Sequence, residues 1–145
     1  MIPDVLIVRE KAGISATTGF TGAAPQQVSG NAIDMREVEP GTLSVCTTVK
    51  GDTNTITLTG KWQVQLKDGA TWVDVASDAN NPANVALATG TAGADAAVQK
   101  VIPAPLAVHA YRKARFVVVS GVAVGAGAGT DEVSQLVYSF IKPSF

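Results

Sequence analysis

The stretch "KWQVQLKDGATWVDV", residues 61–75, limits the possible folds of this chain more than any other. From Trp62 onward apolar residues alternate with polar ones, and Trp72 resumes the alternation after Asp68 and Gly69. A period of two is typical of a strand with one buried face, and Asp-Gly between two such runs is typical of a tight hairpin turn. The pattern predicts a β-hairpin in which both tryptophans lie close together and point into the core.

Further segments rich in β-branched residues follow one another from residue 31 onward, separated by turn-forming residues. These segments are 43–49, 55–60, 85–89, 106–124 and 133–141, and 96–103 alternates weakly. A helical pattern is almost absent, although 94–101 could hold two helical turns. Many short strands with frequent turns predict an all-β fold, an antiparallel β-sandwich that is jelly-roll-like. In the last segment Leu136, Tyr138 and Phe140 are expected to face the core.

The first thirty residues differ from the rest because they are rich in Gly, Ala, Thr and Ser and have no sustained period. We therefore predict an extended N-terminal arm over residues 1–30 and a sandwich domain over 31–145. Strand-like arms can add to an exposed sheet edge through main-chain hydrogen bonds. The predicted contact residues of the arm are its strand-like run and its single large anchor: Val5, Leu6, Ile7, Val8 and Phe20.

Composition narrows the classes of partner. Of the 145 residues 46% are hydrophobic and only 16% are charged, with a net charge of −1. Typical domains carry about 25% charged residues, so many surface positions here are uncharged, as in a protein that docks against others. The longest basic group, residues 111–115, is too small to hold nucleic acid alone, and no apolar run could span a bilayer. We expect a soluble protein, made in a reducing cytoplasm, in which Cys46 is a small buried residue.

The sequence contains no recognisable catalytic constellation. The one histidine, His109, is expected at a strand start, solvated or hydrogen-bonded to backbone. The glycines at 125, 127 and 129 precede a strand pattern and not a helix, so they predict a turn and not a phosphate loop. We predict no catalytic, cofactor or metal site. A hydrolase cleft remains an alternative, and it would need at least two of the carboxylates of Asp34, Glu37, Asp74, Asp78 and Asp131.

The hairpin of residues 61–75, the "YRKAR" strand and the closing "LVYSF" resemble the head decoration, or cement, proteins of tailed bacteriophages. In that family a W-x-V-x-x-S/K-x-DG-x-TW-x-DV hairpin precedes a Y-R-x-x-R strand, and the chain ends close to V-x-Y-S-F. The resemblance covers roughly residues 43–141 and does not include the arm.

The resemblance implies a structural, non-enzymatic virion protein on the outer surface of the capsid. Its partners would be the major capsid protein and further copies of itself, with a trimer as the expected oligomer. Because the arm is expected to contact the capsid, deleting residues 1–13 should leave a folded domain that no longer decorates heads. The alternative is a carbohydrate- or host-surface-binding module of a virion, in which Trp62 and Trp72 would be exposed stacking platforms.

Overall fold

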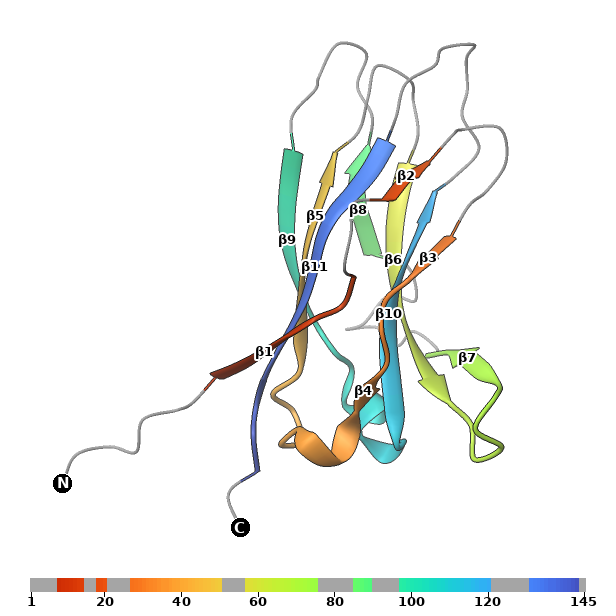
Figure 1. Ribbon diagram of the computed structural model, residues 1–145, viewed down its shortest axis with the longest axis vertical. Coiled ribbons are helices and arrows are strands. Elements are labelled where there is room, and N and C mark those ends of the chain that lie inside the picture. The colour runs from red at the N-terminus through yellow and green to blue at the C-terminus, as the bar shows by residue number, and fades with distance from the viewer. Residues whose placement is uncertain are drawn as a thin grey trace, which may run out of the picture.

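The computed structural model describes residues 8–14, 18–20, 27–50, 57–75, 85–89, 97–120 and 131–143. Two antiparallel β-sheets pack face to face (Figure 1). The first sheet contains β1 (Val8–Ala12), β2 (Thr18–Phe20), β11 (Asp131–Ile141), β5 (Ser44–Lys50) and β9 (Ala97–Pro103). The second contains β3 (Gln27–Ser29), β4 (Ile33–Asp34), β10 (Lys113–Ser120), β6 (Thr57–Gln65), β7 (Trp72–Asp74) and β8 (Val85–Thr89). The predicted all-β sandwich is confirmed.

The strand order is that of a jelly roll. β1 and β2 both pair with β11, β3 and β4 both pair with β10, and β7 and β8 both pair with β6. We count each of these couples as one column of the sheet and each remaining strand as a column of its own. With the columns numbered in chain order, the two sheets read 1-8-3-6 and 2-7-4-5. Successive columns change sheet at every step except from the fourth to the fifth. This arrangement of two Greek keys is a jelly roll, in agreement with the predicted jelly-roll-like sandwich.

The structure decides between two possibilities for one predicted segment and shortens the strand of another. The weakly alternating stretch that could have been helical forms β9, because β5 offers it a full ladder of backbone partners, such as Ile102 opposite Val45. The long apolar segment begins with a 3-10 turn, η2 (Leu106–Ala110), and its strand β10 starts only at Lys113. A second 3-10 turn, η1 (Met35–Glu37), is capped by the side chain of Asp34. The helical segments of the described residues are these short turns, and none of them could span a membrane.

Parts of the predicted arm are strands of the sandwich. β1 pairs along β11, with Val8 opposite Ile141, and β2 pairs farther along the same strand, with Phe20 opposite Asp131. β3 pairs with β10 in the other sheet. These short strands follow no side-chain period because main-chain hydrogen bonds at the sheet margins hold them. Deleting residues 1–13 would therefore remove a strand of the sandwich as well as the residues before it.

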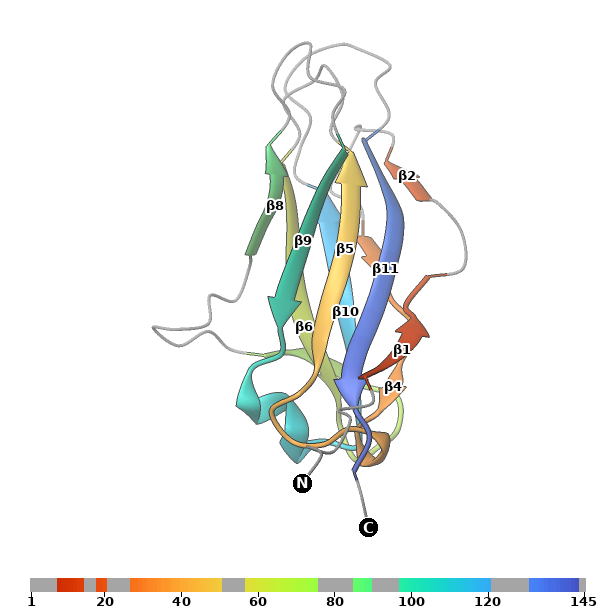
Figure 2. The ribbon, with the colours of Figure 1, turned by 90° about the vertical axis from the view of Figure 1, so that its left-hand side faces the viewer.

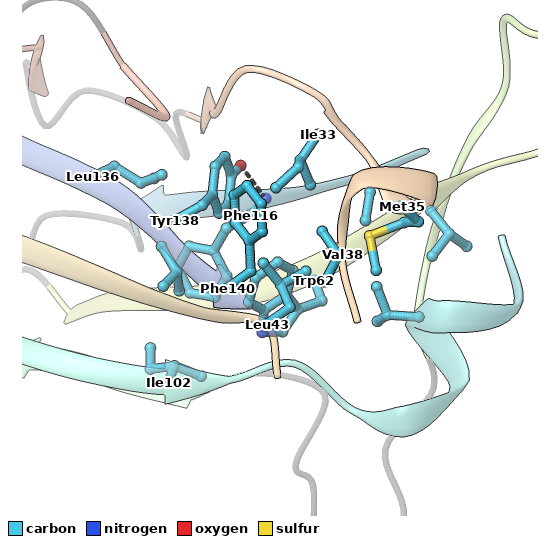
Figure 3. Packing of buried hydrophobic residues seen from close by; sticks show 14 of the residues in the cluster. Ile33, Met35, Val38, Leu43, Trp62, Ile102, Phe116, Leu136, Tyr138 and Phe140 are labelled. Carbon is cyan, nitrogen blue, oxygen red and sulfur yellow. Dashed lines mark hydrogen bonds between the residues drawn. The ribbon is translucent and has the colours of Figure 1, made fainter. Parts of the chain in front are cut away.

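The core lies between the sheets and is centred on three aromatic rings (Figure 3). The Trp62 ring meets Phe116 edge-on at a centroid distance of 5.3 Å and lies 6.0 Å from Tyr138. Leu136, Tyr138 and Phe140 are buried, which confirms the predicted inner face of the last strand. Aromatic pairs in these geometries stabilise a core beyond the area that they bury.

Backbone hydrogen bonds join the two sheets on the side of β1 and β3. Gly13 N–H donates to the carbonyl of Leu136 in β11, at 2.7 Å, and its own carbonyl accepts from Asn31 N–H at 2.5 Å. Gly30 N–H then donates to the carbonyl of Phe116 in β10 at 2.8 Å. A series of backbone hydrogen bonds thus runs from β11 to β10 and closes one side of the sandwich.

The hydroxyl of Tyr138 completes this closure. It accepts a hydrogen bond of 2.8 Å from the backbone N–H of Phe116 (Figure 3). Phe116 lies between the residues of β10 that pair with β3 and those that pair with β4. The hydroxyl therefore takes the place of a strand partner, and burial raises the pKa of Tyr138 to about 12.

Candidate functional surfaces

His109 is a structural residue of the η2 turn. Its Nε2 atom accepts a hydrogen bond of 3.1 Å from the backbone N–H of Gly41. Burial lowers the pKa of the imidazole, so the neutral ring is favoured. The predicted hydrogen bond to backbone is confirmed, although the residue lies in a 3-10 turn and not at the start of a strand.

Replacing His109 with glutamine should remove a pH dependence of stability. The folded chain resists protonation of this ring, whereas the unfolded chain takes up a proton near the ordinary pKa of 6.5. The wild-type chain should therefore lose stability as pH falls below that value, and His109→Gln should not. Thermal midpoints at pH 7.5 and 5.5 measure the difference. Because the chain has one histidine, an equal drop in the variant would contradict this assignment.

Of the five carboxylates that a hydrolase cleft could use, the three whose side chains are described are each paired with a different cation. Asp34 is held by the guanidinium of Arg36, with a shortest contact of 2.7 Å, and these bonds lower its pKa to about 2. Glu37 lies 3.9 Å from Lys11 and Asp74 lies 2.8 Å from Lys61. Asp78 lies outside the described residues, and of Asp131 only the backbone is described. No group of three metal-ligating side chains occurs within the described ranges.

The two tryptophans lie on opposite faces of the second sheet, contrary to the prediction. Trp62 points inward, but Trp72 is opposite Gln65 on the outer face of the β6–β7 hairpin. There the guanidinium carbon of Arg115 lies 4.2 Å from the centroid of the Trp72 ring. Successive residues of a strand point to opposite faces of the sheet. Trp72 pairs with Gln65, which is three residues from Trp62, so the two tryptophans point to opposite faces.

A polar network surrounds this stacked pair. Arg115 Nε donates to Gln63 Oε1 at 2.9 Å, and Gln63 Nε2 donates to Asp74 at 2.7 Å. The Lys61 ammonium holds the other oxygen of Asp74, and the two donors lower the pKa of this carboxylate. These side chains bind one another, so they rigidify the outer face of β6, β7 and β10.

Among its described side chains, the outer face of the first sheet is almost uncharged. It turns toward the viewer in Figure 2, across β1, β11, β5 and β9. One row of cross-strand neighbours is apolar throughout: Ala12, Val137, Cys46 and Val101. Ser44, Thr48, Gln99, Gln135 and Ser139 flank this row, and among the described side chains of the face only Glu10 is charged.

Two apolar residues of this face, Val101 and Cys46, lie outside the core. Val101 is 68% exposed and extends the apolar row onto β9, so the row forms an exposed patch and not a single apolar residue. Cys46 is half-buried on the outer side of β5 and not in the core, because its neighbours Val45 and Thr47 point inward. A sheet face with so few described charges suits contact with another protein surface, since charged residues are depleted at the centres of such interfaces.

The predicted contact residues of the arm are described only in part. Val8 and Phe20 lie in strands that pair with β11, at the margin of the same sheet, and only their backbone is described. Val5, Leu6 and Ile7 lie outside the described residues. The sequence pattern did not point to the outer face of the first sheet, because alternating patterns show which residues are buried and not which exposed face binds.

Comparison with known proteins gives structural likenesses but no relatives by sequence. The sequence matches no protein-family model and no curated protein. The fold is similar to that in the structure of T=1 particles derived from infectious bursal virus, with a TM-score of 0.53 and 13% identity over 95% of this chain. The VP2 subviral particle of infectious bursal disease virus gives a TM-score of 0.51 and 10% identity, also over 95% of this chain.

These likenesses concern the fold. This chain shares its fold with part of these viral particle proteins. It spans about a third of the length of the capsid proteins that it matches, 32% and 34%. At such low identity the shared topology carries no residue roles from those proteins to this chain.

Proposed function

We propose that this chain is a structural virion protein, a capsid decoration protein that binds the outer surface of a phage head and stabilises contacts between major capsid subunits. The observation that carries this proposal is the outer face of the first sheet, nearly uncharged in its described side chains, on a jelly roll similar to one in viral capsid proteins. The motifs shared with tailed-phage decoration proteins support the narrower role. No chemistry is required of the protein in this role.

Energetic considerations support docking by this face. Its apolar row crosses all four columns of the sheet, so contact would bury Val101 and Val137 together with their neutral flanks. Many identical contacts on a shell also act together, because each copy is held at a high effective concentration. We propose that copies associate as trimers, and that Val5, Leu6, Ile7, Val8 and Phe20 extend the contact beyond the sheet margin.

The direct experiment is co-sedimentation of the purified protein with undecorated heads, together with its mass in solution. The proposal expects saturable binding in a fixed ratio to the capsid protein and a trimeric mass. Failure to sediment with heads at any concentration would refute decoration, whereas a monomeric mass with normal binding would refute only the trimer.

Substituting Val101 with glutamate tests the proposed face. Because Val101 is 68% exposed, the domain should fold normally, but a buried unpaired charge would weaken head binding at least about tenfold. Val73, 41% exposed on β7 of the other sheet, provides the matched control Val73→Glu, which should bind as the wild type does. Equal binding by both variants would exclude this face.

The terminal segment needs a shorter deletion than the sequence suggested. Removing residues 1–7 leaves β1 and Gly13 in place, so stability should change little. If Val5, Leu6 and Ile7 contact the capsid, head binding should weaken several-fold in the same sedimentation assay. Unchanged binding would confine the contact to the sheet.

A further inference from the structure

A groove opens where the ladder between β6 and β10 ends. Its last cross-strand pair is Val64 with Ala114. Beyond this pair Gln65 and Leu66 form one wall, and residues 110–113 form the other, next to η2 at the end of the sandwich where β7 lies (Figure 1). Lys67 and Gly69 of the hairpin complete the groove, which has a volume of about 550 Å³. This volume is within the range of small-molecule sites, roughly 300–1,000 Å³.

The charged residues that line the groove are all cations. Lys67, Arg112 and Lys113 line it, and no acidic residue does. None of these three cations forms an ion pair within the described part of the chain. Two carboxylates close by in sequence or register are already engaged.

Asp68, the first of these carboxylates, accepts hydrogen bonds from Ala70 N–H, Thr71 N–H and the Thr71 hydroxyl inside the hairpin turn. Asp34 pairs with Lys113 between β4 and β10, and its carboxylate is bound by Arg36. Of the groups that shift the pKa of Asp34, Arg112 has the smallest effect. The positive charge in the groove is therefore left uncompensated by the hairpin and by η1.

Exposed apolar surface lies beside the cations. Tyr111 is 40% exposed and Leu66 is 38% exposed, and both line the groove. The groove thus combines the aromatic ring of Tyr111 with several cations and the Gln65 amide. Such a combination can bind the apolar face of a ring and an anionic group at the same time.

We propose that this groove binds an acidic saccharide, one or two sugar rings that carry carboxylate or sulfate groups. The cations would hold the anionic groups and Tyr111 would stack on a ring. An acidic peptide fits less well, because a peptide gains much of its affinity by adding to a free strand edge. Backbone groups of the walls are already used: the Arg112 carbonyl accepts from Met35 N–H, and Leu66 pairs with Thr71 and Gly69.

Calorimetric titration of the full chain tests this proposal. The probes are 3′-sialyllactose as the carboxylate source, a sulfated heparin disaccharide as the sulfate source, neutral lactose, and a glutamate-rich hexapeptide. At least one acidic saccharide should bind more tightly than lactose and the peptide, and its binding should weaken as salt is raised. Equal binding of lactose, tighter binding of the peptide, or no saccharide binding would overturn the proposal.

Matched variants locate the site. Arg112→Gln and Tyr111→Ala change exposed residues of the groove and should each weaken saccharide binding about tenfold. Lys142→Gln removes an exposed cation that lines a different surface hollow, beside Arg9 and Glu37, and should have no effect. Thermal melting checks that all three variants fold. If Lys142→Gln weakened binding as much as Arg112→Gln, the attraction would be a general charge effect and the groove would not be the site.

Discussion

Replacing Trp62 with alanine should lower the free energy of unfolding by about 3–5 kcal/mol, the usual cost of removing a buried tryptophan. Trp62 is 4% exposed and contacts both Phe116 and Tyr138, so its loss leaves a cavity at the centre of the core. Since small domains are stable by about 5–15 kcal/mol, a loss of this size should make the chain marginal at physiological temperature. Urea denaturation followed by far-ultraviolet circular dichroism measures the change.

Trp72 is the internal control for this prediction. It lies on the outer face under Arg115, so Trp72→Ala should cost only about 1 kcal/mol, from the lost cation–π contact and stacking area. Fluorescence separates the two residues: Trp72→Phe, which retains Trp62, should emit in the blue and resist quenching by iodide. Equal destabilisation by the two alanine variants would contradict the placement of Trp62 in the core.

Replacing Gly30 with alanine should cost about 3 kcal/mol or more. A β-carbon at this position would lie 2.6 Å from the Tyr138 hydroxyl oxygen and 2.8 Å from the carbonyl oxygen of Phe116. The carbonyl belongs to the central strand β10 and cannot withdraw without breaking its hydrogen bonds. Overpacking typically costs about 1–3 kcal/mol, and displacement of the Tyr138 hydroxyl would also leave the buried Phe116 N–H without an acceptor.

Two further variants distinguish this mechanism from a general effect of the loop. Ala32→Ser, an exposed change two residues away, should stay within about 0.5 kcal/mol of the wild type. Tyr138→Phe should cost about 1–3 kcal/mol alone, yet rescue Gly30→Ala only in part, since the contact with the Phe116 carbonyl remains. Full rescue, or a near-neutral Gly30→Ala, would show that the two sheets are not so closely joined here.

Local pattern predicted most of the strands. The hairpin around Asp68 and Gly69 forms as expected, with Leu66 and Thr71 hydrogen-bonded across the turn. The predicted inward face of β11 is confirmed in the second half of the strand, where Leu136, Tyr138 and Phe140 are buried. Near its start Val133 is also buried, although simple alternation puts it with the outward-facing Gln135. A register shift between these two residues, which sequence period cannot reveal, turns Val133 inward.

Neither candidate surface could be predicted in the same way. The outer face of the first sheet joins Ala12, Val137, Cys46 and Val101, which are distant in sequence and become neighbours only through the order β1-β11-β5-β9. The basic groove likewise depends on where the β6–β10 ladder ends. Each residue taken alone is an ordinary strand or turn residue, so no motif marks it.

The amino-acid sequence by itself determined the all-β class, the hairpin and most of the buried strand faces, because alternation and turn residues act through neighbours along the chain. The tertiary structure alone decided the order of the strands, the incorporation of residues 8–12, 18–20 and 27–29 into the sheets, and the opposite orientations of Trp62 and Trp72. Strand order, register and main-chain pairing depend on which distant segments bury one another best, and that comparison exists only in the folded chain.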